Sequence, residues 1–176
     1  MKLLVFGQTG QLAQELIRRA PAGVLVQALG RDLADLANPD ACAEAIRTTD
    51  ADAIINAAAW TAVDKAEAEE DAATVVNGAA PTAMALAAAA RGLPFLHVST
   101  DYVFDGAGTH AFTTDHPVAP LGAYGRSKLA GEQGVRAAGG NHLILRTSWV
   151  FSAHGANFVK TMLRLGATRE SLTVVA

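Results

Sequence analysis

Two residues that could exchange protons stand four positions apart in the second half of the chain. Tyr124, one of only two tyrosines, precedes Lys128 in the stretch "AYGRSKLAGEQ". On a helix, residues at this spacing share one face, about 6 Å apart along the axis. A free phenol has a pKa of about 10, and a nearby ammonium lowers that pKa because it favours the phenolate. The pair therefore predicts a tyrosine that acts as a general acid beside a lysine.

A YxxxK spacing alone is weak evidence, because most such pairs are a packed ring and a solvated lysine. Hydroxyl groups at the end of a strand strengthen it here. Ser99 is the last residue of the apolar run "FLHVS", and Thr100 is the first residue of the stretch "TDYVFDG" that follows it. Ligand crevices of open α/β sheets form at the carboxyl ends of strands. The sequence thus predicts hydroxyl donors in the same crevice as Tyr124.

A glycine turn near the N-terminus predicts a nucleotide site. In "VFGQTGQLA", Gly7 and Gly10 stand three apart, with Ala13 at the third position. Such a turn lets a pyrophosphate approach the backbone and rest on a helix N-terminus, where free amides and the helix dipole favour anions. A tight turn without any ligand is the alternative, and the position directly after the first apolar run disfavours it.

The end of the second apolar run bears on the choice between NAD and NADP. An acidic residue there would accept hydrogen bonds from the ribose, whereas an arginine can hold a 2′-phosphate. The run ends in Gly30 and Arg31, with Asp32 behind them. We expect Arg31 to hold the phosphate of NADP because its guanidinium fork suits that group. The alternative is that Arg31 is a solvated loop charge.

Apolar runs of strand length alternate with segments that should be helical. The expected strands are residues 3–6, 24–29, 53–57, 95–99 and 143–147, and near-continuous apolar strands indicate a sheet covered on both faces. Helices are expected over 11–19, after Asn38 as N-cap, along an Ala-rich segment ending near 91–92, from about 124, and from 157. This order predicts an α/β fold, a Rossmann-like, doubly wound parallel sheet with helices on both faces.

Three local features carry further expectations. Pro81 should kink or split the Ala-rich helix near 77–80, because proline removes a backbone donor. The acidic stretch "DKAEAEEDAA" should be a solvated helix face. "SLTVV" at 171–175 should be a strand, and a strand that runs into the end of the chain suggests a fragment or a shortened member of its fold.

Composition limits the classes of function. With 176 residues, 51% hydrophobic and 18% charged, the chain fits one globular domain. A net charge of -3 without a basic stripe argues against nucleic acid as a partner. One cysteine excludes an internal disulfide framework, and an N-terminal apolar run of five residues is too short for a signal peptide or a membrane span, so a cytoplasmic protein is expected. The five histidines lack zinc-site spacing, so no metal is expected.

The chain resembles the N-terminal, cofactor-binding part of an extended short-chain dehydrogenase/reductase, and within that superfamily the dTDP-4-dehydrorhamnose reductases. The resemblance spans nearly all of the chain, and the blocks "STDYVF" and "RTSWVF" are its most discriminating parts. Further matching stretches are "GQTGQLAQEL", "NAAAWTAVDKAE", "VNGAAPTAMALA", "YGRSKLAGE" and "NFVKTMLRL". Residues 1–176 are thus expected to form a dinucleotide-binding domain that lacks the C-terminal substrate-binding part.

The resemblance implies a role for individual residues. It makes Tyr124 the proton donor, and Lys128 the residue that lowers its pKa and holds the nicotinamide ribose. Thr100 would position the substrate carbonyl, with Ser99 as the less favoured neighbour, and Asp101 and Trp149 would contact the sugar nucleotide. Asn77 resembles a helix asparagine that supports the proton relay of related reductases. Besides Arg31, Tyr124 and Lys128, the implied cofactor residues are Gly7, Gly10, Gln11, Leu12, Asp35, Leu36, Ala59, Trp60 and Thr61.

The implied reaction is reduction of dTDP-4-dehydro-6-deoxy-L-mannose to dTDP-L-rhamnose by NADPH, with NADH as an alternative cofactor. Two positions depart from the family pattern: Gly30 replaces a frequent acidic residue, and Trp60 replaces a histidine of some members. Some relatives use Mg²⁺ at a homodimer contact, and Glu15 matches one of their ligands. Two alternatives stay open: a non-catalytic NADP-binding regulatory subunit resembling the one that associates with methionine adenosyltransferase, and a nucleotide-sugar epimerase or dehydratase.

Overall fold

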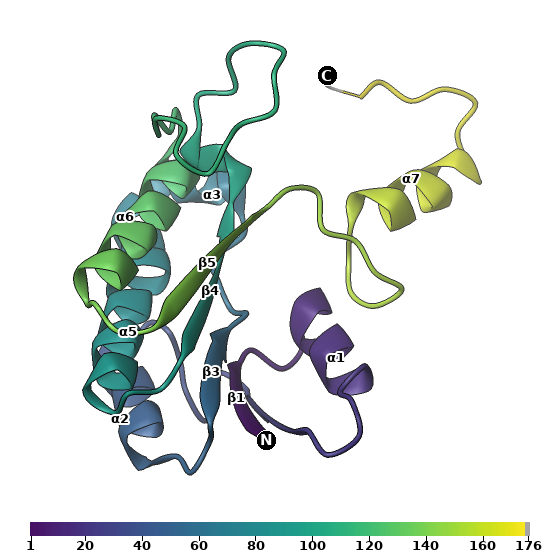
Figure 1. The fold of residues 1–176 in the computed structure, drawn as a ribbon. Helices are drawn as coiled ribbons and strands as arrows, with labels where there is room; N and C mark the ends of the chain where they lie inside the picture. Colours follow the sequence, from purple (N-terminus) through teal and green to yellow (C-terminus); the bar gives the residue numbers. More distant parts are fainter. Residues whose placement is uncertain (175–176) are drawn as a thin grey trace.

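Five parallel strands form a single sheet in the order β2-β1-β3-β4-β5 (Figure 1). The structure is a computed structural model of the 176-residue chain, and it describes residues 1–174. The strands are β1 (Lys2–Phe6), β2 (Leu25–Leu29), β3 (Ala53–Asn56), β4 (Phe95–Thr100) and β5 (His142–Thr147). Each lies within one residue of the bounds predicted from the apolar runs. The parallel, doubly wound sheet is confirmed.

The strand order reverses between β1 and β3, which are neighbours in the sheet. Phe6 pairs with both Leu29 of β2 and Asn56 of β3. The chain therefore leaves β1 toward one side and returns to the other side after β2. In open α/β sheets this switch point opens a crevice at the carboxyl ends of the strands, here at Gly7 and at Ala57.

The helices lie on both faces of the sheet, but unequally. In Figure 1, α2, α5 and α6 cover one face, and α1 lies on the other with α7 beyond it. The ranges are α1 (Gln11–Arg18), α2 (Pro39–Thr48), α3 (Val63–Ala68), α4 (Glu70–Thr74), α5 (Ala80–Ala90), α6 (Ala123–Ala137) and α7 (Phe158–Gly166). The main core lies under α2 and α5, where Phe6, Ile46 and Met84 are fully buried. On the other face, Leu143 and Leu145 of β5 remain exposed.

Two helices begin at asparagine caps, of which Asn38 was expected from the sequence and Asn157 was not. Asn38 Oδ1 accepts a hydrogen bond from the Ala41 amide at 3.2 Å, directly before Pro39. Asn157 Oδ1 accepts from the Lys160 amide at 3.0 Å at the start of α7. In both cases a side-chain oxygen satisfies an amide that has no partner within its helix.

The Ala-rich helix widens into one π-helical turn over Val75–Ala79, immediately before Pro81. Pro81 has no amide to offer the Asn77 carbonyl, so the regular ladder cannot pass through this turn. A Cβ on Gly131 of α6 would lie 2.1 Å from that carbonyl oxygen. The missing side chain thus lets α6 approach the π turn closely. The predicted disturbance at 77–80 is confirmed, and its form is a π turn.

Gly131→Ala should lower the free energy of unfolding by about 1–3 kcal/mol, because the new methyl would overlap a backbone oxygen that cannot rotate away. Urea unfolding followed by circular dichroism measures this loss. Gly166→Ala is the control: Gly166 is the last residue of α7, and a Cβ there would meet nothing within 4 Å. Equal stability of the two variants would contradict the close contact at the π turn.

The predicted strand at 171–175 is wrong over its described part, since residues 171–174 have no regular structure. Val175 lies outside the described residues. The acidic stretch forms α3 and α4, as expected. Glu70–Ala90, which runs continuously through the π turn, is long and apolar enough to cross a membrane by length and composition, but half of it is buried inside the domain. It is the core helix of the domain.

Candidate active site

The glycine turn after β1 presents free backbone amides at the switch point. Gly7 has a φ of +111°, a conformation that side chains disfavour, and its amide donates to the Leu29 carbonyl at 2.9 Å. Gly10 is the N-cap of α1, and no side chain caps that helix. The first amides of α1 are therefore open to an anion, as a pyrophosphate requires.

A groove of about 450 Å³ runs from this turn along the ends of β1, β2 and β3. It brings together most of the residues predicted on the nucleotide side: Gly7, Gly10, Arg31, Asp35, Leu36, Ala59 and Thr61. Backbone amides line one end and partly apolar side chains the other. This arrangement fits an adenine nucleotide with its phosphates on α1.

Gly30, Arg31 and Asp32 form the lip of the groove. A Cβ on Gly30 would lie 2.5 Å from Asp32 Oδ1 and 2.8 Å from Gln8 Oε1, so the glycine makes room for both side chains. Arg31 Nε lies 3.8 Å from Asp35 Oδ1, and the Arg31 side chain is 86% exposed. The guanidinium is thus free to turn toward a phosphate, while Asp32 stands where a ribose hydroxyl could reach it.

A second cavity of about 640 Å³ lies at the ends of β4 and β5. Its lining includes the predicted residues Gln11, Leu12, Thr100, Asp101, Tyr124, Lys128 and Trp149, and also Ser99. Thr9, Gly10, Ala57, Ala58, Ala59 and Thr61 line both hollows. One continuous channel therefore leads from the glycine turn to the phenol and the ammonium.

Two contacts with other elements place Tyr124 at the start of α6. Gly122 is the N-cap, and the carboxylate of Glu67 in α3 accepts the Ala123 amide at 2.8 Å. A Cβ on Gly125 would lie 2.3 Å from the Tyr102 carbonyl oxygen. Glu67 thus caps the helix from outside, and Gly125 lets its first turn lie against the strand-end segment. These contacts explain the glycines on either side of Tyr124.

The environment of Tyr124 corrects one expectation. Burial raises the pKa of Tyr124, the Thr100 hydroxyl lowers it in part, and the charges of Asp101 and Tyr102 raise it further. Lys128 is not among these causes, and its Nζ donates to the Val98 carbonyl at 2.7 Å. The prediction that Lys128 lowers the phenol pKa is therefore wrong for the protein by itself. The phenol is protonated at neutral pH.

Burial lowers the pKa of Lys128 to about 8, against a smaller opposing effect of the Glu132 charge. Its side chain is almost fully buried, and it lines the same cavity as Tyr124. A lysine side chain with this pKa can gain or lose its proton close to neutral pH.

Thr100 and Asp101 form a small polar cluster opposite Tyr124. The Thr100 hydroxyl accepts from the Tyr102 amide at 3.2 Å and lies 3.2 Å from Asp101 Oδ1, to which it donates. Ser148 Oγ donates to Asp101 Oδ2 at 2.6 Å, which joins the end of β4 to the loop after β5. The Thr100 proton can turn from Asp101 to another oxygen in the cavity.

Trp60 is the one predicted cofactor residue that lines neither hollow within the described chain. Its indole donates to the Ala62 carbonyl at 3.0 Å and its ring lies under Lys65. Asn77 holds its backbone: Oδ1 accepts the Trp60 amide at 2.8 Å and Nδ2 donates to the Trp60 carbonyl at 3.1 Å. The second donor of Nδ2 goes to Ser127. Both donors of Asn77 are used, so it fixes the loop beside the channel.

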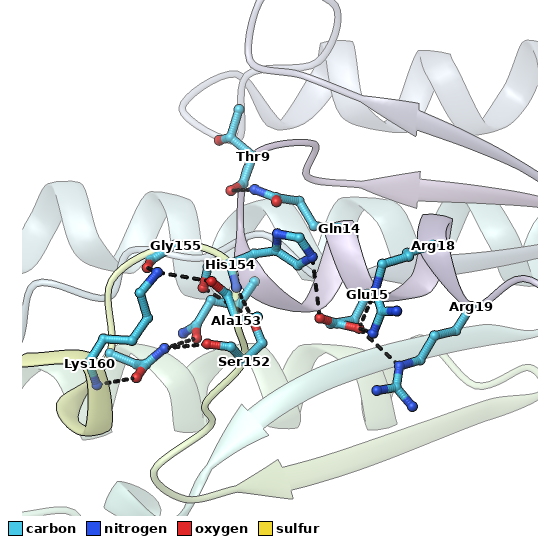
Figure 2. Close-up of polar contacts among 12 residues, drawn as sticks. Thr9, Gln14, Glu15, Arg18, Arg19, Ser152, Ala153, His154, Gly155 and Lys160 are labelled. Atoms are coloured by element: carbon cyan, nitrogen blue, oxygen red, sulfur yellow. Dashed lines mark hydrogen bonds and ion pairs between the residues drawn. The ribbon is translucent and has the colours of Figure 1, made fainter. Parts of the chain in front are cut away.

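The loop after β5 docks onto the glycine-turn helix. Asn157 Nδ2 donates to Gln11 Oε1 at 2.9 Å, and Figure 2 shows His154 of this loop facing Glu15 of α1. The same loop carries Trp149, whose backbone has a φ of +51° and whose ring packs edge-on against Phe158. The loop that carries Trp149 is thus tied to α1.

Glu15 does not have the surroundings of a metal ligand. Arg18 and Arg19 both contact its Oε2, at 2.6 and 2.9 Å, and these hydrogen bonds lower the pKa of the carboxyl (Figure 2). Among residues 1–174, no three His, Cys, Asp or Glu side chains come together as a cation site.

Sequence reasoning missed several lining residues that the strand-end rule could have found. All of them lie one to three residues after a predicted strand: Gln8, Thr9, Asp32, Ala58, Tyr102 and Ser148. Counting one to five residues past each apolar run would have included them.

Known proteins resemble this chain over its whole length. The family model described as RmlD substrate binding domain matches residues 1–176. A dTDP-4-dehydrorhamnose reductase of Sinorhizobium fredii is 49% identical over the whole chain, which covers 60% of that protein, and the one of Escherichia coli K12 is 46% identical over 99% of this chain and 60% of its own length.

Solved structures agree as well. A dTDP-4-dehydrorhamnose reductase of Clostridium acetobutylicum superposes with a TM-score of 0.94 at 39% identity, over 99% of this chain and 62% of that one. The enzyme of Bacillus anthracis in complex with NADP superposes with a TM-score of 0.91 at 36% identity, over 96% of this chain and 60% of that one. The chain spans about three fifths of the curated relatives it matches. It belongs to the RmlD substrate-binding domain family.

Proposed function

We propose that the protein is a dTDP-4-dehydrorhamnose reductase, which reduces dTDP-4-dehydro-6-deoxy-L-mannose to dTDP-L-rhamnose with NADPH. The observation that carries this proposal is that Thr100, Tyr124 and Lys128 line one cavity that continues into the glycine-turn groove. The relatives named above support the choice of substrate.

The chain's own residues bind, orient and move one proton. The amides of the first turn of α1 hold the pyrophosphate, and Arg31 turns onto the 2′-phosphate. Bound NADPH supplies the hydride. Thr100 turns its hydroxyl proton from Asp101 to the keto oxygen, and Tyr124 gives its proton to the alkoxide that develops there. A phenol whose pKa is raised is suited to this role because it carries its proton at neutral pH.

We further propose that residues 1–176 form the dinucleotide-binding part and one wall of the substrate pocket. In the relatives, the remaining length would supply the rest of the sugar-nucleotide pocket. Trp149 and Asp101 are then the contacts of this chain to the sugar nucleotide. We place the reaction in the cytoplasm, where nucleotide sugars and NADPH are available. We also propose that the protein forms a homodimer.

Two assays test the proposal. NADPH binding to the 176-residue chain is followed by the change in cofactor fluorescence. NADPH oxidation with the dTDP-4-keto sugar is then measured on the chain alone and on a chimera that adds the C-terminal part of the Sinorhizobium fredii relative. Sugar-dependent oxidation by the chimera supports a reductase. Binding of NADPH without oxidation by the folded chimera would favour a regulatory subunit, and conversion of a nucleotide sugar without net oxidation would favour an epimerase.

Arg31→Ala should weaken NADPH binding about tenfold and leave NADH binding nearly unchanged, because only NADPH offers the 2′-phosphate to the guanidinium. Fluorescence titrations with both nucleotides measure this. Arg47→Ala, which removes an arginine from an exposed pair with Glu44 outside the groove, is the control for net charge. Equal losses of affinity for NADPH and NADH would show that Arg31 does not bind the 2′-phosphate.

A further inference from the structure

His97 is a buried titratable residue for which the proposed reaction has no use. It lies in the middle of β4 and is fully buried, between Phe95 on its own strand and Gly131 of α6. A Cβ on Gly131 would lie 3.4 Å from His97 Nε2, so the ring is packed directly against the helix that carries Tyr124 and Lys128. A ring in this place can act on the site only through its two nitrogens.

Both ring nitrogens of His97 face a polar group. Nδ1 lies 3.2 Å from Asn56 Nδ2, and Nε2 lies 3.4 Å from Lys128 Nζ. The Asn56 amide is oriented by its other end, because Oδ1 accepts the Ala58 amide at 3.2 Å. A reversed amide would set its NH₂ group against that N–H. Asn56 therefore presents a donor to Nδ1, and Nδ1 must accept.

The tautomer follows from this chain of hydrogen bonds. A neutral imidazole that accepts at Nδ1 carries its proton on Nε2, the nitrogen that faces Lys128. Burial and the neighbouring Lys128 charge lower the pKa of His97 well below its ordinary value, so the ring is neutral. An ammonium has donors only and cannot accept the Nε2 proton, whereas a neutral amine can.

We propose, building on the proposed function, that His97 is a positioning residue: held by Asn56 as its Nε2–H tautomer, it disfavours the ammonium form of Lys128 and fixes where its Nζ lies. The polar groups that the structure places against Lys128 are the Val98 carbonyl and His97 on β4 and the Glu132 charge on α6, and Tyr124 and Asp101 line the same cavity. Of these, the Val98 carbonyl and the Glu132 charge favour the ammonium. Glu132 is itself paired with Arg146 and Arg136. His97 is the polar contact that opposes the charge.

The test is a titration of Lys128 in the 176-residue chain, read by NMR of ¹³C-labelled lysine. The chain has only four lysines, which keeps the spectrum simple. In the unchanged protein, Lys128 should titrate at about 8. In His97→Gln, whose side-chain oxygen can accept from the ammonium, the Lys128 pKa should rise by about one pH unit. His142→Gln, the same substitution at the partly exposed start of β5, is the matched control and should leave that pKa in place.

A second measurement needs no variant. The ¹⁵N shifts of the His97 ring in the unchanged protein show which nitrogen carries the proton, and the proposal requires Nε2. A proton on Nδ1, or the same Lys128 pKa in the unchanged protein and a folded His97→Gln, would overturn it. Neither the Lys128 titration nor the His97 ¹⁵N shifts depend on turnover. A negative reductase assay would therefore not affect the proposal for His97, and a negative NMR result would not affect the proposed reductase function.

Discussion

Replacing Tyr124 with Phe should lower turnover of the chimeric reductase by about 100- to 10,000-fold, the range that a positioned general acid contributes. The variant loses one oxygen and no packing volume, so the buried ring and the start of α6 should survive. NADPH should bind about as before. Loss of sugar-dependent NADPH oxidation with retained cofactor fluorescence is the expected result, and unchanged turnover would remove Tyr124 from the mechanism.

The other tyrosine provides the matched control for this variant. Tyr102 also lines the cavity, and its ring stands edge-on to Tyr124 with centroids 5.5 Å apart. Tyr102→Phe keeps that ring contact and should cost far less activity. The pH dependence follows from the raised pKa of Tyr124: kcat/KM should hold through neutral pH and fall only as the pH passes that raised value and the phenol loses its proton.

The sequence could predict the sheet and the place of the site because both follow from local rules. Apolar runs bounded by turns gave all five strands, and ligand groups gather where such strands end. Gly7, Thr100 and Tyr124 were therefore expected in one crevice, and they do line one channel. Asn38 was readable as a cap because its partner is three residues away.

Contacts between distant elements could not be predicted in this way. Glu67 caps α6 across 56 residues of chain, and nothing in its own helix distinguishes it from Glu69 or Glu70. The raised pKa of Tyr124 was missed for a similar reason, because a face shared with Lys128 says nothing about the burial of the phenol or about the Val98 carbonyl that accepts a hydrogen bond from Lys128. The π turn was foreseeable as a disturbance from Pro81, but its form depends on how closely Gly131 lets α6 approach.

Arg146→Met should lower the free energy of unfolding by about 3–5 kcal/mol, the largest loss of stability that we expect from one substitution in this chain. Glu132 of α6 is fully buried, and Arg146 of β5 donates to both of its oxygens at 2.8 and 2.7 Å. Without Arg146, only Arg136 at 3.2 Å remains to offset a buried carboxylate. Urea unfolding at neutral pH measures the loss.

A surface pair of the same chemistry is the control. Arg126 donates to both oxygens of Glu70 at 2.7 and 2.8 Å, but both side chains are about two fifths exposed, so Arg126→Met should cost no more than about 1 kcal/mol. The double variant Arg146→Met, Glu132→Leu should recover much of the loss, because it removes the buried charge together with its partner. Equal losses for Arg126→Met and Arg146→Met would contradict the role of burial.

Acidification should narrow the difference in stability between the unchanged protein and Arg146→Met. Burial alone would raise the pKa of Glu132, but the hydrogen bonds from Arg146 and the charges of both arginines outweigh it, so the pKa is lowered. The stability from this pair is therefore present above the unfolded pKa of about 4.3 and is lost as the pH falls through the lower folded value. In Arg146→Met, burial dominates and protonation relieves the uncompensated charge as the pH falls. The stability gap between the unchanged protein and Arg146→Met should thus be widest at neutral pH and close on acidification, whereas a gap independent of pH would show that the loss is one of packing.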